Sequence, residues 1–353
     1  MAIVKALRFD PRDLRYRALI GVGGIGSGVF FAIRGNETVG REESRLGRFL
    51  DRRDYCKLHI IAHYVATLLG PDFVTMPVGR VGDDPTGQRL LREMVEAGIE
   101  TRFVKVARGY PTLHSFCFLY PDGAGGNLTT EDSACSRIDA RALEEAAPEF
   151  DRFLGEGIAL AAPEVPLSAR AALLDLGRSR TFFNVAAFSS EEILPALENG
   201  LLNNVDLLGM NRHEAATLTN LPAEEYDPER IFEAAIAVLD RHQPGMLVSV
   251  TAGAQGSWVW NGRRATHRPA LRVAVRSAAG AGDAHLAGLI AGLSAGMTPD
   301  QAHELASLLA SFTVTSPHTI HPDVSRSTLR EFACGHRAAL SPEVSEMLQE
   351  QTI

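Results

Sequence analysis

The sequence predicts an α/β protein in which helices cover a largely parallel sheet. Short apolar runs alternate along the chain with longer segments whose apolar residues have helical spacing. The chain has 353 residues, 45% hydrophobic and 22% charged, which is typical of a globular protein with a large core. We therefore interpret residues 1–353 as a single domain built on one α/β core.

The short apolar runs are the candidate strands. Helical segments lie between most of them, as in units that join parallel strands. The predicted strands are Ala18–Val22, Phe73–Val78, Thr112–Leu119, Ile158–Ala161, Thr181–Val185, Val205–Leu208 and Met246–Val250, with a further short strand at Arg272–Val275.

The helices are predicted from apolar spacing together with start and stop residues. Thr86–Ala97 has its apolar residues on one face and is followed by Gly98. Pro299–Val314 has Thr298 as its N-cap and a proline at its first helical position. The same criteria predict helices at Ser168–Leu176 and Pro228–Arg241.

Two regions do not fit the pattern of strands and covering helices. Residues 29–53 are rich in Gly, Arg and Glu, and residues 108–130 read as a hairpin with its turn at Pro121–Asn127. We expect these two regions to form a small β-rich lid. An exposed edge strand in such a lid could pair with a second copy, so a homodimer through the lid is compatible with the sequence.

Charge and composition exclude several classes of partner. The formal net charge of −8 argues against a nucleic-acid surface. No apolar run approaches the roughly 20 residues that a membrane-spanning helix needs, and the N-terminal segment lacks the apolar region of a signal peptide. The four cysteines are scattered and are expected to be reduced thiols in a cytoplasmic protein.

The segment Gly280–Asp283, which opens an Ala- and Gly-rich helix, is the strongest candidate for chemistry. Small residues at a helix start expose backbone N–H groups that can hold an anion. A carboxylate at that position suits a base that deprotonates a hydroxyl attacking a phosphoryl group. The alternative is a glycine-rich turn with Asp283 as an ordinary helix-start charge. In the helix that follows, Ala284, Gly288 and Gly292 form a smooth face that we expect to pack against a sheet.

Two further loops follow predicted strands, at the edge where α/β proteins bind ligands. Asn211 and Glu214 are three residues apart, and oxygen ligands of this kind can organise Mg²⁺ through water. The alternative for this pair is helix capping. The loop from Thr251 to Gly256, which includes Gly253, is by itself only a turn.

Two other patterns compete for a functional role. The run Gly21–Gly26 fits GxGxxG after a strand, but no helix is expected to follow it, as a dinucleotide-binding dehydrogenase would require. His59 and His63 have the spacing of a zinc site on a helix, but no third ligand is suggested. We prefer a tight turn and packed histidines, respectively.

Taken in order, these segments resemble the ribokinase-like (PfkB-type) carbohydrate kinase family, from roughly Leu19 to Thr315. Residues 78–87 resemble its vG-x-vG-D-D-x-x-G segment, and residues 211–214 its NxxE motif. Residues 251–256 are similar to its T-x-G-x-x-G nucleotide loop, and residues 280–284 to its GAGDA signature, the most specific of the four.

The resemblance implies a three-layer α/β/α core with a β-rich lid and phosphoryl transfer from ATP with Mg²⁺. Asp283 would be the general base, and the backbone of Gly280, Ala281, Gly282 and Asp283 would form the anion hole. Asn211 and Glu214 would place hydrated Mg²⁺ and the phosphates. The nucleotide pocket would be lined by Thr251, Gly253, Gly256, Ser307 and Ser311.

The chain departs from the family pattern in its acceptor half. The family's sugar-binding Asp corresponds to Gly28, and its GGxxAN segment is replaced by residues 55–60. Ser277–Ala279 replaces the usual D-T-T, which puts activation by a monovalent cation in doubt. The candidates for acceptor binding are Gly28, Asn36, Lys57 and His59.

Basic residues near the altered segment leave the charge of the acceptor open. Lys57 and His59, with Arg41, Arg45 and Arg48, could meet an anionic substrate, because guanidinium groups bind phosphate well. The alternative is a solvated charged segment, in which Arg45 and its acidic neighbours pair with one another.

We therefore predict an ATP-dependent kinase of a small hydroxylated, sugar-like metabolite. A nucleoside kinase is the alternative among enzymes, since the same motifs serve both. A nucleotide-binding regulator that has lost sugar phosphorylation is the alternative from another class. The retained Asp283 argues against it, because a binding protein needs no base.

Overall fold

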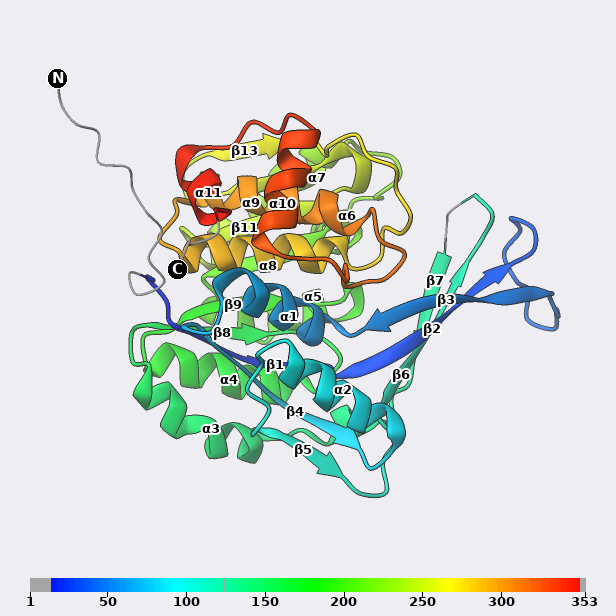
Figure 1. Ribbon diagram of the computed structural model, residues 1–353, viewed down its shortest axis with the longest axis horizontal. Helices are drawn as coiled ribbons and strands as arrows, with labels where there is room; N and C mark the ends of the chain where they lie inside the picture. The colour runs from blue at the N-terminus through cyan, green and yellow to red at the C-terminus, as the bar shows by residue number, and fades with distance from the viewer. Residues whose placement is uncertain (1–13, 123–124, 350–353) are drawn as a thin grey trace.

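A nine-stranded sheet forms the centre of the computed structural model, which describes residues 14–122 and 125–349 (Figure 1). Its order is β13-β12-β11-β10-β9-β8-β1-β4-β5. The strands from β11 to β5 pair in parallel, whereas β12 and β13 are antiparallel to their neighbours. The predicted, mainly parallel sheet is confirmed. The strands are β1 (Ala18–Val22), β4 (Val74–Gly82), β5 (Val104–Ala107), β8 (Gly157–Ala161), β9 (Phe183–Ala187), β10 (Leu207–Asn211), β11 (Leu247–Thr251), β12 (Ser257–Trp260) and β13 (Ala265–Arg268).

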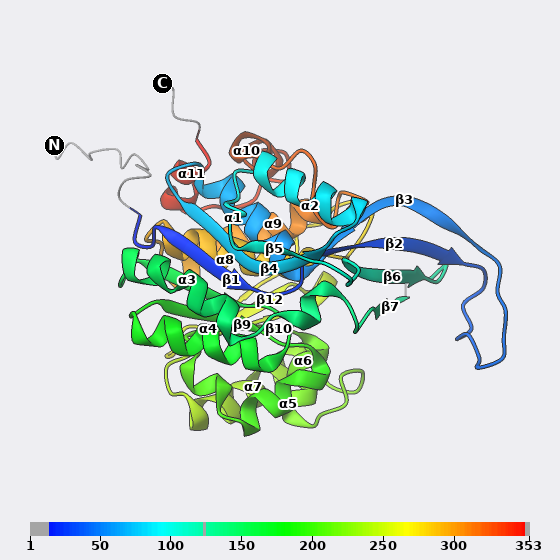
Figure 2. The ribbon, with the colours of Figure 1, turned by 90° about the horizontal axis from the view of Figure 1, so that it is seen from below.

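Helices cover both faces of the sheet and give the three layers seen in Figure 2. One face carries α1 (Lys57–Leu69), α2 (Pro85–Glu96), α8 (Ala281–Ser294), α9 (Pro299–Thr313), α10 (Arg326–Gly335) and α11 (Pro342–Met347). The other carries α3 (Ala140–Arg152), α4 (Leu167–Ser179), α5 (Ser190–Glu198), α6 (Arg212–Thr219) and α7 (Pro228–His242).

Each face of the sheet has its own hydrophobic core. In β1, Leu19 belongs to the core under α1 and α8, whereas Ala18 and Ile20 belong to the core on the other face. Successive residues of a strand point to opposite faces, so a strand covered on both sides reads as one apolar run. This is why β1 has no polar alternation and could be predicted with its full extent.

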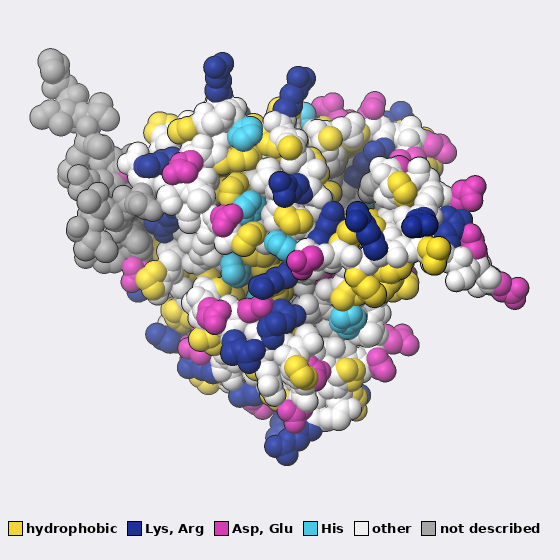
Figure 3. Space-filling view, turned by 45° about the vertical axis from the view of Figure 1, so that its right-hand side comes forward, with side chains coloured by type: hydrophobic (Ala, Val, Ile, Leu, Met, Phe, Trp, Pro, Cys, Tyr) yellow, Lys and Arg dark blue, Asp and Glu magenta, His cyan; other side chains and the backbone are white. Residues whose placement is uncertain are grey.

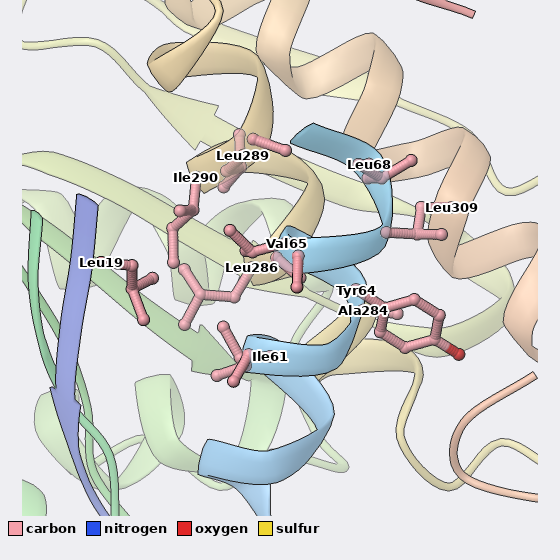
Figure 4. Close-up of a cluster of buried hydrophobic side chains, with 14 of the residues drawn as sticks. Leu19, Ile61, Tyr64, Val65, Leu68, Ala284, Leu286, Leu289, Ile290 and Leu309 are labelled. Atoms are coloured by element: carbon pink, nitrogen blue, oxygen red, sulfur yellow. The ribbon is translucent and has the colours of Figure 1, made fainter. Parts of the chain in front are cut away.

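Helices α1, α8 and α9 pack together on one face of the sheet. Figure 4 shows Ile61 and Val65 of α1 close to Leu286 and Ile290 of α8, with Leu19 of β1 beside them. This packing holds α8, and with it the segment Gly280–Asp283, against the sheet.

The expectation that the small-residue face of α8 lies on a sheet is wrong. A Cβ built on Gly288 would lie 2.5 Å from the Cα of Ala306, and one on Gly292 would lie 2.8 Å from the Cα of Ala302, so this face packs closely on α9. The sheet side of α8 instead carries Leu286, whose side chain fills the space above a glycine of β10.

The predicted strand Arg272–Val275 is also wrong. These residues have no strand partner, and Val275 is 63% exposed. The chain instead runs beside α9, where Leu271 N–H donates to the hydroxyl of Ser311 and Arg276 N–H donates to the carbonyl of Val314. The valines of this short run have a high strand propensity, but that propensity alone does not pair the segment with a sheet.

A second sheet projects from the core and forms the lid (Figure 1). It consists of β2 (Gly26–Ile33), β3 (Gly47–Tyr55), β6 (Leu113–Leu119) and β7 (Gly125–Thr129), in the order β3-β2-β6-β7. The predicted hairpin is formed by β6 and β7, which are antiparallel. Within its expected turn, residues 123 and 124 lie outside the described part of the chain.

The glycine-rich run Gly21–Gly26 leads from β1 directly into strand β2. A dinucleotide-binding loop would open a helix at this point, so the dehydrogenase interpretation lacks its structural context. Within residues 14–122 and 125–349, no helix has the length and apolar character needed to span a membrane.

Candidate active site

A cavity lies where β9, β10 and β11 end and α8 begins. It brings together residues from segments far apart in the chain, as expected when parallel strands end at one edge of a sheet. Its lining includes Lys57, Asn211, Glu214, Ser249, Thr251, Gly282, Asp283 and His285. Lys57 of this lining comes from the first turn of α1.

The turn before α8 has the backbone geometry of an anion site. Gly280 is the N-cap residue with φ of 82°, a left-handed conformation that favours glycine. A Cβ at Gly280 would lie 2.4 Å from the carbonyl oxygen of Thr319. The amides of Gly282 and Asp283 lie in the first helical turn, where backbone N–H groups have no partner within the helix. An anion in the cavity can accept from them.

Asp283 is the carboxylate of this turn. Burial raises its pKa to about 6, while Lys57 opposes this rise and Glu214 and Asp54 add to it. A carboxylate with a pKa close to neutrality can take a proton from a hydroxyl and later release it. This electrostatic setting distinguishes Asp283 from an ordinary helix-start charge.

Asn211 and Glu214 form a capping box at the start of α6. The Asn211 side-chain oxygen accepts from Glu214 N–H at 2.9 Å, and Glu214 Oε2 accepts from Asn211 N–H at 2.7 Å. The other oxygen, Glu214 Oε1, lies 3.5 Å from the ammonium nitrogen of Lys57 at the cavity. Capping thus uses one carboxylate oxygen and leaves the second for the site.

Lys57 is the cation at the centre of three carboxylates. Burial lowers the pKa of Lys57, but Glu214, Asp283 and Glu164 together raise it by more than burial lowers it. The pKa therefore lies above its ordinary value, and the side chain is charged. A charged lysine in this position can meet a phosphoryl group as well as balance its acidic neighbours.

The predicted nucleotide loop joins β11 to β12. Thr251 ends β11, and a single 3₁₀ turn covers Gly253–Gln255. Gly253 and Gly256 have φ of 55° and 90°, and a Cβ at Gly256 would lie 2.0 Å from the carbonyl oxygen of Arg268. The left-handed φ favours glycine at both positions, and close approach adds a steric reason at Gly256 alone.

Ser307 and Ser311 lie on α9, outside the cavity lining. Ser307 Oγ is 3.3 Å from the hydroxyl of Ser257, and Ser311 Oγ accepts from Leu271 N–H. In the described residues both hydroxyls thus have protein partners next to the nucleotide loop.

Gly28 lies on β2, and its missing side chain makes room for a carboxylate from the neighbouring strand. A Cβ at Gly28 would lie 2.3 Å from Asp54 Oδ2 and 2.2 Å from Ser115 Oγ. Asp54 Oδ2 accepts from the hydroxyl of Ser115 at 2.6 Å and from the thiol of Cys117 at 3.5 Å. Burial raises the pKa of Asp54 although these bonds lower it.

The remaining acceptor candidates lie away from the cavity. Asn36 is exposed in the lid, where it accepts from the backbone N–H of Asp122. His59 is buried in α1, and burial lowers its pKa to about 3, so it is neutral. Arg45 pairs with Glu43 at 2.6 Å, while Arg41 and Arg48, the other two arginines considered for an anionic substrate, are exposed.

Two carboxylates were missed by the sequence reasoning, Asp54 and Glu164. Glu164 has a left-handed φ of 74°, unusual for a residue with a side chain, and its buried Oε2 accepts no hydrogen bond among the described residues. Burial raises its pKa to about 7, and Lys57 lowers it. The signal available for Glu164 was its position just after the strand Ile158–Ala161; the lid segment around Asp54 offered none.

The model of the pfkB family carbohydrate kinases matches residues 61–326. No curated protein sequence matches the chain at a significant level. Ribokinase from Cryptococcus neoformans var. grubii serotype A, solved with ADP, aligns at TM-score 0.72 and 18% identity over 90% of this chain and 99% of that chain. Arabidopsis thaliana ribokinase, solved with ribose and ATP, aligns at TM-score 0.65 and 20% identity over 95% of this chain and 100% of that chain. Burkholderia thailandensis nucleoside kinase, solved with inosine, aligns at TM-score 0.69 and 16% identity over 90% of this chain and 98% of that chain. These likenesses show the fold.

Proposed function

Because the chain belongs to the pfkB carbohydrate kinase family, we propose that it transfers the γ-phosphoryl group of ATP to a hydroxyl of a small sugar-like metabolite. The observation that carries the proposal is the meeting, in one cavity, of Asp283, with its raised pKa, and the first-turn amides of α8, which have no partner within the helix. A base and an anion site side by side are what phosphoryl transfer to a hydroxyl requires.

In this reaction the acceptor oxygen forms a bond to the γ-phosphorus while the bond from that phosphorus to the bridging oxygen breaks. The hydroxyl proton passes to the carboxylate of Asp283, and ADP leaves with the bridging oxygen. The amides of Gly282 and Asp283 and the ammonium group of Lys57 stabilise the negative charge that spreads over the phosphoryl oxygens.

The donor set fits Mg²⁺ held through water. Within the described residues no three His, Cys, Asp or Glu side chains form a cluster that could enclose a metal. Glu214 Oε1 is not used by the capping box, and together with Asn211 it could hold water ligands of the ion. When bound, Mg²⁺ would neutralise phosphate charge.

The acceptor end favours an uncharged, polyhydroxylated molecule. Asp54 and Glu164 are buried carboxylates whose charges act on Asp283, and burial raises the pKa of each, so we place the acceptor beside them. Carboxylates accept hydrogen bonds from hydroxyls and repel anions. Arg45, one of the basic residues considered for an anionic substrate, pairs with Glu43.

The lid also supports a homodimer. Its edge strands β3 and β7 carry the exposed side chains of Phe49 and Leu128, which are 67% and 65% accessible. Figure 3 shows hydrophobic side chains gathered on the projecting part of the molecule. Exposed apolar edges of this kind can pair with a second copy. Sedimentation of the Phe49→Glu variant, expected to be monomeric, tests this.

The first experiment measures ATP consumption over a panel of sugars, sugar phosphates and nucleosides. We expect turnover with an uncharged sugar or sugar-like alcohol. Preference for a nucleoside would favour the alternative kinase, and ATP binding without turnover on the whole panel would favour the regulator.

The second experiment replaces the base. Asp283→Asn should lower kcat by about 10²–10⁴-fold, the usual contribution of a general base, with ATP affinity largely retained. Asp300→Asn is the matched control, because Asp300 is the first-turn carboxylate of α9 and pairs with Arg264 instead of facing the cavity. Unchanged turnover in the Asp283 variant would overturn the assignment.

A further inference from the structure

Behind the cavity, five polar side chains from five elements form an unbroken line of hydrogen bonds. Ser249 of β11 lies 3.3 Å from Nδ1 of His285 in α8, whose Nε2 lies 2.9 Å from the hydroxyl of Ser257 in β12. That hydroxyl lies 2.8 Å from Nε2 of His303 in α9, and Nδ1 of His303 lies 3.1 Å from the hydroxyl of Thr266 in β13. Both ends of the nucleotide loop are thus connected to α8.

The two histidines in this line are buried and neutral. His285 is 2% exposed and His303 is fully buried. Burial lowers the pKa of His285 to about 3 and that of His303 to about 2. A neutral imidazole has one N–H donor and one acceptor nitrogen. Each ring must therefore donate in one direction along the line and accept from the other.

The far end of the line determines its direction. The hydroxyl of Thr266 donates to the carbonyl of Val259, which can only accept. Thr266 then accepts from Nδ1–H of His303, and Nε2 of His303 accepts from the hydroxyl of Ser257. Ser257 in turn accepts from Nε2–H of His285. If the chain ran in the opposite direction, the hydroxyl of Thr266 would donate to His303, and its hydrogen bond to the carbonyl of Val259 would be lost.

At the cavity, the same direction determines that the hydroxyl proton of Ser249 points toward His285. Its hydroxyl donates to Nδ1 of His285, so Ser249 offers only acceptor lone pairs to the cavity that it lines. Asp283 lies two residues before His285 on α8. A shift of the histidine relative to β11 would therefore move the base and the anion turn.

We propose that Ser249, His285, Ser257, His303 and Thr266 form a directed hydrogen-bond chain that positions the catalytic helix α8 against the nucleotide loop, and that Ser249 thereby becomes an acceptor-only group in the cavity. His285 is a positioning residue at the centre of the chain. The functional consequence rests on the proposed kinase activity, whereas the direction of the chain does not.

The direction is tested by the nitrogen chemical shifts of ¹⁵N-histidine in the whole protein at neutral pH. His285 is expected as the Nε2–H tautomer and His303 as the Nδ1–H tautomer. The signals are assigned by their loss in His285→Asn and His303→Asn. The opposite pair of tautomers, or a protonated ring, would overturn the proposal without bearing on phosphoryl transfer.

Positioning is tested with three variants of His285. His285→Phe removes both bonds, whereas His285→Asn keeps an acceptor for Ser249 and His285→Gln keeps a donor for Ser257. We expect the affinity for the magnesium complex of AMP-PNP, an ATP analogue, to fall roughly tenfold in His285→Phe. A loss of this size corresponds to about one hydrogen bond. The other two variants should recover part of the affinity. In the turnover assay kcat should fall in the same order, with KM for the acceptor unchanged.

Ser294→Ala is the matched control for Ser249→Ala. Ser294 is a buried serine of α8 whose hydroxyl has no partner among the described residues. Its variant should bind and react as the parent protein does, whereas Ser249→Ala, which loses only the bond to Nδ1 of His285, should show the partial loss expected of His285→Gln. If all His285 variants keep parental affinity and kcat and lose only thermal stability, the chain is a packing feature and the proposal is wrong.

Discussion

The proposed reaction site has a phosphate end and an acceptor end, and the two are built from different kinds of groups. At the phosphate end, the functional groups are backbone amides and a capping box, formed by neighbours in sequence such as Asn211 and Glu214. At the acceptor end we place Asp54 and Glu164, two carboxylates from separate segments that do not line the cavity and whose pKa values are raised by burial. The first end is determined by local backbone geometry, and the second by tertiary contacts.

The phosphate end can be tested through its glycine. Gly280→Ala forces a side chain into a left-handed conformation against the carbonyl of Thr319, so the anion turn must move. We expect kcat to fall by about 10²–10³-fold, as when one oxyanion donor is lost.

Gly296→Ala is the matched control for this variant. Gly296 has φ of 78°, close to the 82° of Gly280, but a Cβ there has no neighbour within 4 Å. Both variants should lose stability in thermal unfolding through the left-handed φ, and Gly280→Ala should lose more because of its contact with Thr319, while only Gly280→Ala loses activity. Equal kinetics for the two would show that the turn does not hold the transferring group.

Lys57 lies between the two ends, and its removal should affect both. Lys57→Met is expected to lower kcat/KM by roughly 10²-fold through loss of a charge-assisted contact to phosphate. Lys57 lowers the pKa of Asp283, so without it that pKa rises above about 6. Because the base acts as a carboxylate, the acidic limb of the kcat/KM profile should move to higher pH.

The lysine Lys105 in β5 provides the comparison for Lys57. Lys105→Met should leave both the rate and the pH profile as in the parent protein. A parental acidic limb in Lys57→Met would mean that Asp283 does not set the pH dependence.

Asp54 tests the acceptor end alone. Asp54→Asn keeps the shape of the side chain but weakens its acceptance from a substrate hydroxyl, so KM for the acceptor should rise roughly tenfold, in line with a hydrogen bond to a charged group. KM for ATP should stay constant. Asp51→Asn, an exposed position on the same strand β3, should change neither constant. A parallel rise in KM for ATP would instead indicate that the whole lid is displaced.

This contrast explains which features could be predicted from the sequence. The sheet, confirmed by the structure, was visible because buried parallel strands such as β1 are short apolar runs bounded by turns. The candidate roles of Asp283 and the Asn211–Glu214 pair came from local motifs, and they remain predictions. Asp54 was not found, because its significance depends on Gly28 and Ser115 across strand pairings that no local pattern encodes. The partner of the smooth face of α8 was misjudged for the same reason, since glycine spacing predicts close packing but not which element packs.

Glu164 is expected to affect the stability of the protein and not its turnover. Its folded pKa of about 7 lies above the ordinary value of 4.5, so the folded protein holds this proton more tightly than the unfolded chain does. The resulting stabilisation is present below about pH 4.5 and is lost as pH rises through about 7. Glu164→Gln does not titrate, so relative to the parent it should gain up to about 3 kcal/mol of unfolding free energy between pH 4 and pH 8.

Denaturant unfolding across this range measures the difference, and Glu198→Gln, at an exposed position of α5, should show none. A difference between Glu164→Gln and the parent that stays constant with pH would mean that the carboxyl of Glu164 is ionised in the folded protein and balanced by Lys57, which would make the acceptor end as well paired as the phosphate end.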